Sequence, residues 1–149
     1  LAGGASPADI YRDLYERETA GRVRLRGTVL ARIQTELNGK LAHTFILPDD
    51  YENTGAQPTD TEDLINLALE IDGTAFAVII VGQTSGGYKM SFRSRCESAA
   101  NVVAKEFGGG GHKAAAGAFL DINDCAEVQS RVLTHVRAVL PAEYEQNTA

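Results

Sequence analysis

The sequence predicts an α/β fold in which a mixed β-sheet, built partly from hairpins, is flanked by helices and preceded by a helical linker. Three observations lead to this prediction. Apolar side chains recur three or four positions apart in residues 19–33 and 124–139, as in amphipathic helices. Residues 76–81 are mostly β-branched, which is typical of a buried strand. Two turn signals, Asn38-Gly39 and Ser85-Gly86-Gly87, each separate stretches of strand character.

The linker is expected to cover residues 1–33, and residues 34–149 form the domain that follows it. Ser6 and Pro7 are typical of the N-cap and first turn of a helix, and a second helix should span residues 19–33. Because the chain begins without Met, we expect it to be part of a longer protein.

Turn and capping signals place the remaining elements. Asn38-Gly39 predicts a hairpin, and the capping box of Thr59 and Glu62 predicts a helix through about residue 71. Ser98 and Asp124 are expected to cap two later helices. The elements expected after residue 75 are a strand at 76–81, a strand at 88–95, a helix at 98–107, a strand at 116–120 and a last helix from 124 to 139.

Composition and charge limit the function. No apolar run approaches the roughly 20 residues that a membrane span needs. The net charge of −6 argues against a general duplex binder, which usually presents a basic field. Cys96 and Cys125 match no metal motif and fit a reducing cytoplasm. No Asp and His cluster lies at ligand spacing, so we expect neither metal ligands nor catalytic residues in this chain.

The most informative segment is a run of four glycines, Gly108 to Gly111, followed by His112 and Lys113. Glycine loses more backbone entropy on folding than other residues, so another gain must offset the entropic cost of the run, for example the close approach of a ligand to the bare backbone. Consecutive N–H groups can form a concave anion site, to which His112 adds a donor and Lys113 a charge. A Walker loop is excluded because Ala114 follows Lys113, and a dinucleotide fingerprint is excluded because a helix precedes the run.

The strand at 88–95 is the expected source of cations. Alternate residues of a strand share a face, so Ser91, Arg93 and Arg95 should point the same way. The two arginines would then lie roughly 6.5 Å apart along the strand. A guanidinium matches phosphate geometry. The alternatives are that the arginines form a solvated edge, that the glycine run is a connector and that His112 is structural.

Two of these segments resemble motifs of one family. Residues 90–95 and 107–117 resemble the strand motif and the glycine-histidine motif of the DHHA1 domain of DHH/DHHA1 phosphoesterases. Residues 61–66 and 71–73 resemble the helix and turn before the central strand, and residues 6–30 resemble the segment that joins the DHH domain to DHHA1. The bifunctional oligoribonuclease and pAp-phosphatase branch is the most similar. By this resemblance, residues 1–33 are the linker and end of a missing DHH domain, and residues 34–149 are DHHA1.

The resemblance implies a phosphoesterase that hydrolyses short RNA oligonucleotides as an exonuclease, and 3′-phosphoadenosine 5′-phosphate (pAp). The divalent metal, commonly Mn²⁺, would be held by the missing DHH domain, so this chain alone would bind no metal and not catalyse. Arg93 and Arg95 would bind phosphate, and Gly109, Gly110 and Gly111 would offer backbone donors. His112 would contact the phosphate or the terminal nucleotide, and Asn66 is a further candidate. The expected partners are short single-stranded RNA or a nucleotide and the protein's own DHH domain, in the cytoplasm and away from membranes; a homodimer is compatible with the resemblance.

Other functions share parts of this pattern. A non-catalytic RNA-binding module, as in the C-terminal domain of alanyl-tRNA synthetases, also carries a glycine run. RecJ-like exonucleases and cyclic-dinucleotide phosphodiesterases share the domain. A scaffolding domain with an idle glycine loop is the remaining alternative.

Overall fold

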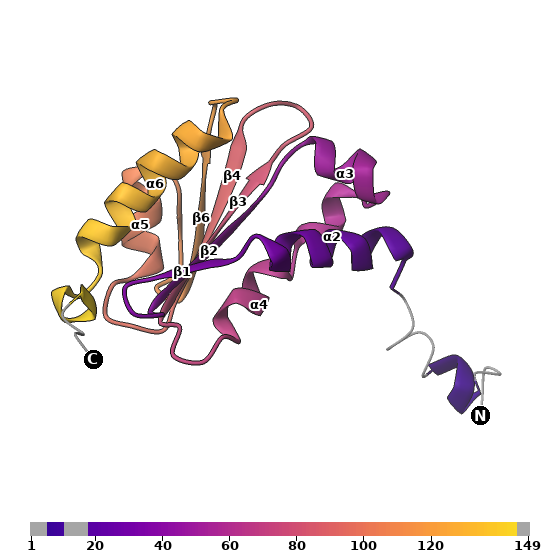
Figure 1. Cartoon of the computed structure of the whole chain (residues 1–149), viewed down its shortest axis with the longest axis horizontal. Coiled ribbons are helices and arrows are strands. Elements are labelled where there is room, and N and C mark those ends of the chain that lie inside the picture. The colour runs from indigo at the N-terminus through magenta and orange to yellow at the C-terminus, as the bar shows by residue number, and fades with distance from the viewer. Residues whose placement is uncertain (1–5, 11–17, 146–149) are drawn as a thin grey trace.

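A computed structural model describes residues 6–10 and 18–145, and it places a six-stranded sheet between two groups of helices (Figure 1). In spatial order the strands are β1 (Gln34–Glu36), β2 (Leu41–Ile46), β3 (Phe76–Gly82), β4 (Tyr88–Ser94), β6 (Ala115–Leu120) and β5 (Gly110–Gly111). Strands β2 and β3 are parallel, and all other neighbours are antiparallel. The predicted mixed α/β fold is therefore confirmed.

Each group of helices packs on one face of the sheet (Figure 1). The helices on one face are α2 (Ala20–Ala31), α3 (Asp49–Thr54) and α4 (Leu64–Leu69), and those on the other are α5 (Ala100–Glu106) and α6 (Cys125–Val139). All seven residues of β3 are buried because this strand contributes alternate side chains to both cores. None of the described helices is long and apolar enough to cross a bilayer.

Helices α2, α3 and α4 leave part of their face of the sheet open. On β4 and β6, the side chains toward α5 and α6 are buried, as Phe92 and Ala118 show. The side chains on the opposite face include Lys89 and Phe119, which are exposed. The sheet formed by β4, β6 and β5 therefore has one covered face and one accessible face.

Two predicted helix N-termini are wrong. The capping box of Thr59 and Glu62 does not form; instead Asp60 Oδ2 accepts the N–H of Gln57 at 2.8 Å, and the 3₁₀ helix η1 (Pro58–Thr61) precedes α4. Ser98 does not cap α5, because its hydroxyl donates to the Val139 carbonyl oxygen at 2.7 Å. In both places a side chain forms a hydrogen bond other than the one that the capping prediction requires.

The other capping predictions are confirmed. Ser6 Oγ accepts the N–H of Asp9 at 3.2 Å, and Asp124 Oδ1 accepts the N–H of Ala126 at 3.0 Å. The helix expected to follow Ser6 runs into residues 11–17, outside the described residues. The hairpin at Asn38-Gly39 also forms, but with positive φ at Leu37 as well as at these two residues.

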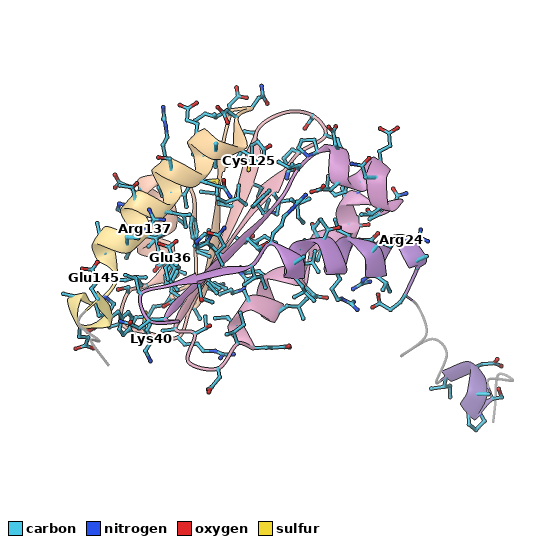
Figure 2. The ribbon with its side chains drawn as sticks, in the orientation of Figure 1. Arg24, Glu36, Lys40, Cys125, Arg137 and Glu145 are labelled. Atoms are coloured by element: carbon cyan, nitrogen blue, oxygen red, sulfur yellow. The ribbon has the colours of Figure 1, made fainter. Side chains whose placement is uncertain are left out.

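The hairpin β1–β2 is tied to the last helix by charge. Arg137 of α6 donates to both carboxylate oxygens of Glu36, at 2.7 and 3.0 Å, and the two side chains lie side by side in Figure 2. The hydrogen bond from Arg137 lowers the pKa of Glu36 despite its partial burial, and His43 contributes to the lowering. The last helix, with the 3₁₀ helix η2 (Ala142–Glu145) that follows it, is thereby fixed to the start of the sheet.

Candidate functional site

Strand β4 carries a polar row along the accessible face of the sheet. Lys89, Ser91 and Arg93 alternate with buried residues, so the predicted two-faced pattern of this strand is confirmed. In the described part of the chain, the Arg93 side chain makes one hydrogen bond, from Nη1 to the Phe92 carbonyl oxygen at 3.1 Å. Lys89 makes no hydrogen bond or ion pair with any described residue. Both side chains therefore retain donors for a ligand.

This row forms one wall of a polar cleft of about 380 Å³. Gln83 and Thr84, from the turn after β3, continue the wall, and Thr61 and Glu62, from the end of the 3₁₀ helix η1, line the opposite side. Ile79 and Val81 of β3 also contribute to the lining. The cleft thus lies where helix α4 ends its cover of the sheet and the accessible face begins.

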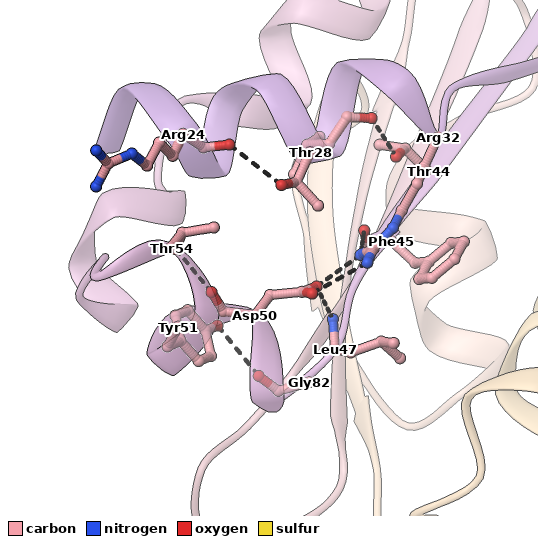
Figure 3. Close-up of polar contacts among 11 residues, drawn as sticks. Arg24, Thr28, Arg32, Thr44, Phe45, Leu47, Asp50, Tyr51, Thr54 and Gly82 are labelled. Atoms are coloured by element: carbon pink, nitrogen blue, oxygen red, sulfur yellow. Dashed lines mark hydrogen bonds and ion pairs between the residues drawn. The ribbon is translucent and has the colours of Figure 1, made fainter. Parts of the chain in front are cut away.

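The wall formed by α3 is held by a partly buried ion pair (Figure 3). Arg32 donates to both carboxylate oxygens of Asp50, at 2.6 and 3.0 Å, and Asp50 also accepts the N–H of Leu47. The next residue, Tyr51, lines the cleft and donates its hydroxyl to the Gly82 carbonyl oxygen at 3.1 Å. Burial, with a smaller effect of the Asp50 charge, raises the pKa of Tyr51, so it remains a neutral donor at physiological pH.

The glycine run is not an open loop: it ends helix α5 and then forms the edge strand β5. Gly108 has a φ of +80°, and the N–H of Gly109 donates to the Ala104 carbonyl oxygen at 2.8 Å, as in a helix C-cap. Gly110 and Gly111 pair with Gly117 and Ala116 of β6. The sequence predicted no strand at this place.

Three of the glycines are required by the fold itself. A Cβ on Gly109 would lie 2.1 Å from the Gly117 carbonyl oxygen, and one on Gly111 would lie 2.6 Å from Ala116 Cα. Gly108 requires its positive φ. Gly110 differs, because a Cβ there would meet nothing within 4 Å and its φ is not in the left-handed region. No contact within the described residues therefore requires glycine at this position.

The run offers fewer free amides than a concave anion site would. The N–H of Gly109 is used by the helix, and that of His112 donates to the Ala115 carbonyl oxygen at 2.8 Å. His112 and Ala115 exchange both backbone hydrogen bonds, so the next pair, Gly111 and Ala116, is a non-hydrogen-bonded pair of the ladder. The N–H of Gly111 therefore points away from β6 at the open edge, whereas that of Gly110 points toward β6.

Strand register brings the main predicted residues to one face. Opposite residues of an antiparallel pair share a face, and Arg93 lies opposite Ala115, which in turn lies opposite His112. Ser91, Gly117 and Gly110 form the neighbouring row. With strands about 4.8 Å apart, the backbones of Arg93 and His112 are roughly 10 Å apart across this face. The result is a floor of small residues with a guanidinium on one side and an imidazole on the other.

Arg95 and Asn66 lie outside this arrangement. Arg95 Nη1 donates to the Leu69 carbonyl oxygen at 2.9 Å, at the C-terminal end of α4, where a positive charge is favourable. Asn66 is exposed on α4, whereas Ile65 is the residue of that helix that lines the cleft. The structure thus groups Arg93, Gly110 and His112 but brings neither Arg95 nor Asn66 to them.

Lys89 is a cleft residue that sequence reasoning missed but could have found. The same alternation that groups Ser91 with Arg93 extends back by two residues to Lys89, so the signal was present in the strand. The opposite wall, with Thr61 and Glu62, depends on where α4 packs, and no local pattern carries that information. No group of three His, Cys, Asp or Glu that could hold a metal ion occurs among the described residues.

Comparison with known proteins finds the same domain. Residues 38–138 match the DHHA1 domain family. The chain is 37% identical over 117 residues to the bifunctional oligoribonuclease and PAP phosphatase NrnA of Thermus thermophilus, a match that covers 78% of this chain and 34% of that protein. The chain therefore spans about a third of the length of this curated relative.

Two solved structures resemble the fold. An exopolyphosphatase-related protein from Bacteroides fragilis aligns with a TM-score of 0.73 and 27% identity, covering 89% of this chain and 38% of that one. A pGpG-specific phosphodiesterase from Vibrio cholerae aligns with a TM-score of 0.57 and 18% identity, covering 90% of this chain and 44% of that one. At this identity the second likeness concerns the fold alone.

Proposed function

Because the chain belongs to the DHHA1 domain family, we propose that it is the substrate-holding domain of a metal-dependent phosphoesterase acting on short RNA oligonucleotides and pAp. The observation that carries the proposal is the shared face of Arg93, Gly110 and His112, a floor of small residues with cationic and hydrogen-bonding groups beside it. The similarity to NrnA supports this class of substrate.

Each of these residues has a separate task in the proposal. Arg93 binds a phosphate through the guanidinium N–H groups that do not donate to the Phe92 carbonyl oxygen. Gly110 admits the ligand to the backbone because it has no side chain on that face. His112 donates to the phosphate or to the terminal nucleotide. Lys89 adds a positive charge two residues from Ser91 on the same face.

The hydrolytic metal ions, Mn²⁺ by the resemblance, find no fitting set of ligands among residues 6–10 and 18–145. The described residues offer no group of three ligands, and no step is assigned to a metal here. We therefore propose that a separate DHH domain holds the metals and that this chain closes over it with bound substrate. Cys96 and Cys125 are free thiols, which suits the cytoplasm that we propose as the compartment.

The test is turnover of the full-length protein with Arg93 or His112 replaced by alanine. Removing a group that holds charge in the transition state lowers kcat by about 100-fold or more. The kcat of Arg93→Ala and that of His112→Ala should therefore each be lower than the wild-type kcat by at least that factor. Arg131→Ala is the matched control, since Arg131 pairs with Glu127 on the solvent side of α6. Unchanged turnover in both site variants, with unchanged thermal unfolding, would show that this face is not the substrate site.

A further inference from the structure

The accessible face of the sheet carries an exposed aromatic ring as well as cations. Phe119 of β6 is 51% exposed, although its neighbour Ala118 is buried, and β5 pairs with β6 only at Ala116 and Gly117, so β5 does not extend to this ring. Phe119 is paired with Lys89, so its ring is on the face that holds Ser91 and Arg93. The described helices leave this ring without a cover.

The ring has a defined support. A Cβ on Gly87 would lie 2.3 Å from Cζ and 2.7 Å from Cε2 of Phe119, which means that the ring rests on the bare backbone of Gly87. That backbone is itself held, since Gly87 donates its N–H to Asn123 Oδ1 at 2.8 Å. A ring that is supported on one side and open on the other is preorganised for stacking, because little side-chain entropy remains to be lost.

The ring also lies at a useful distance from the proposed phosphate position. Phe119 is two residues along β6 from Gly117 and four from Ala115, or roughly 7 and 13 Å along the sheet. Gly110 lies opposite Gly117, and Arg93 and His112 lie opposite Ala115. Lys89 lies opposite Phe119 on the neighbouring strand β4. An anionic chain that starts at Arg93 and runs along the small-residue floor therefore reaches an aromatic ring next to a second cation.

We propose that Phe119 is a stacking platform for a nucleobase of the ligand whose phosphate lies at Arg93. The proposal rests on the proposed function and adds a specificity-determining residue to it. Stacking on an aromatic ring is tolerant of base identity, since every base has a π-face. Phe119 therefore favours nucleotides and short oligonucleotides over sugar phosphates without selecting one base. Lys89 neutralises a phosphate next to the stacked base.

The experiment compares two probes, pAp and ribose 5-phosphate, in titrations of the full-length protein in metal-free buffer, where no turnover occurs. Loss of one base stack corresponds to a loss of affinity of roughly 5- to 150-fold, so Phe119→Ala should weaken the binding of pAp by that factor and leave the binding of ribose 5-phosphate unchanged. Phe119→Tyr keeps the ring and should retain wild-type affinity for both probes. Val102→Ala is the control, since Val102 is 63% exposed on α5, against the other face. The Phe119 ring protons should shift upfield with pAp and not with ribose 5-phosphate.

Several outcomes would overturn the proposal. Equal affinity of wild type and Phe119→Ala for pAp would do so, as would an equal loss for both probes. Unchanged pAp affinity together with reduced turnover would show that Phe119 packs against another domain instead. Failure of the underlying function looks different: Arg93→Ala would then bind both probes as tightly as the wild type. If the wild type bound neither probe, both proposals would be overturned.

Discussion

Gly109 and Gly110 are adjacent in the chain, yet they must be glycine for different reasons. A Cβ on Gly109 would collide with the backbone of β6, whereas one on Gly110 would project into open space above the accessible face. Gly109 is thus required by the fold, and Gly110 is required by the ligand that we propose.

Replacing each by alanine should separate these two roles. Overpacking against backbone costs about 1–3 kcal/mol, so Gly109→Ala should lower the free energy of unfolding by an amount in that range. Gly110→Ala should change it by less than about 0.5 kcal/mol, as at other open surface sites, but should weaken pAp binding. Urea unfolding and a pAp titration of both variants measure the two effects. Wild-type pAp affinity in Gly110→Ala would contradict the role assigned to this residue.

Residue-level reasoning from sequence succeeded where one local rule decides the outcome. The alternation of apolar and polar side chains in β4 places Arg93 on the accessible face, and the structure agrees. The same rule grouped Arg95 with Arg93, but Arg95 follows the last residue of the strand and its side chain donates to Leu69 instead. That contact depends on where α4 ends, which strand periodicity does not encode.

At the scale of elements, the ion pair of Arg32 and Asp50 joins the C-terminal end of α2 to α3. Arg32 also donates to the Phe45 carbonyl oxygen and lies over the Phe45 ring, with its guanidinium carbon 4.6 Å from the ring centroid (Figure 3). Burial raises the pKa of Asp50, but hydrogen bonds from Arg32 and Leu47 and the Arg32 charge outweigh it. The pKa therefore lies below its ordinary value of 3.8.

This shift predicts how stability depends on pH. A carboxyl group whose pKa is lowered in the folded state stabilises the fold above its unfolded pKa, and the contribution is lost as the pH falls through the folded value. The free energy of unfolding should therefore decrease as the pH falls below about 4. The free energy of unfolding of Asp50→Asn should be lower than that of the wild type at pH 7, and it should decrease less as the pH falls.

Glu36 also has a lowered pKa, so some acid dependence should persist in Asp50→Asn. Glu127→Gln serves as the matched control, because Glu127 is an exposed carboxylate paired with Arg131 and should contribute little. Urea unfolding at pH 7, 4 and 3 gives the comparison. If the free energy of unfolding of Asp50→Asn decreased with pH as much as that of the wild type, the role assigned to Asp50 would be refuted.

Elements were predictable from sequence in proportion to their length and periodicity. Helix α6 has 15 residues with a periodic buried stripe at Val128, Val132, Leu133 and Val136, and its position agrees with the prediction. Strand β5 has two residues, both glycine, so it has no side-chain pattern, and its pairing with β6 emerges only in the folded chain. The capping box predicted at Thr59 does not form, and the carboxylate of Asp60 accepts the N–H of Gln57 instead.

For the whole molecule, the consequential feature is the difference between the two faces of the sheet. Helices α5 and α6 cover one face of β4 and β6, whereas α2, α3 and α4 leave the other face accessible (Figure 1). Arg93, Gly110, His112, Lys89 and Phe119 all lie on that accessible face. A domain with net charge −6 thus concentrates cationic and hydrogen-bonding groups where its sheet is open, which suits a specific site rather than a general basic surface.

The most direct test of this account is an NMR titration of the 149-residue chain with pAp and with a 5′-phosphorylated RNA dinucleotide. The account predicts that amide shifts cluster at Arg93, at residues 108–112 and at Phe119, and that Arg93→Ala abolishes them. Shifts that cluster instead on α5 and α6, or that persist unchanged in Arg93→Ala, would contradict a substrate site on the accessible face of the sheet.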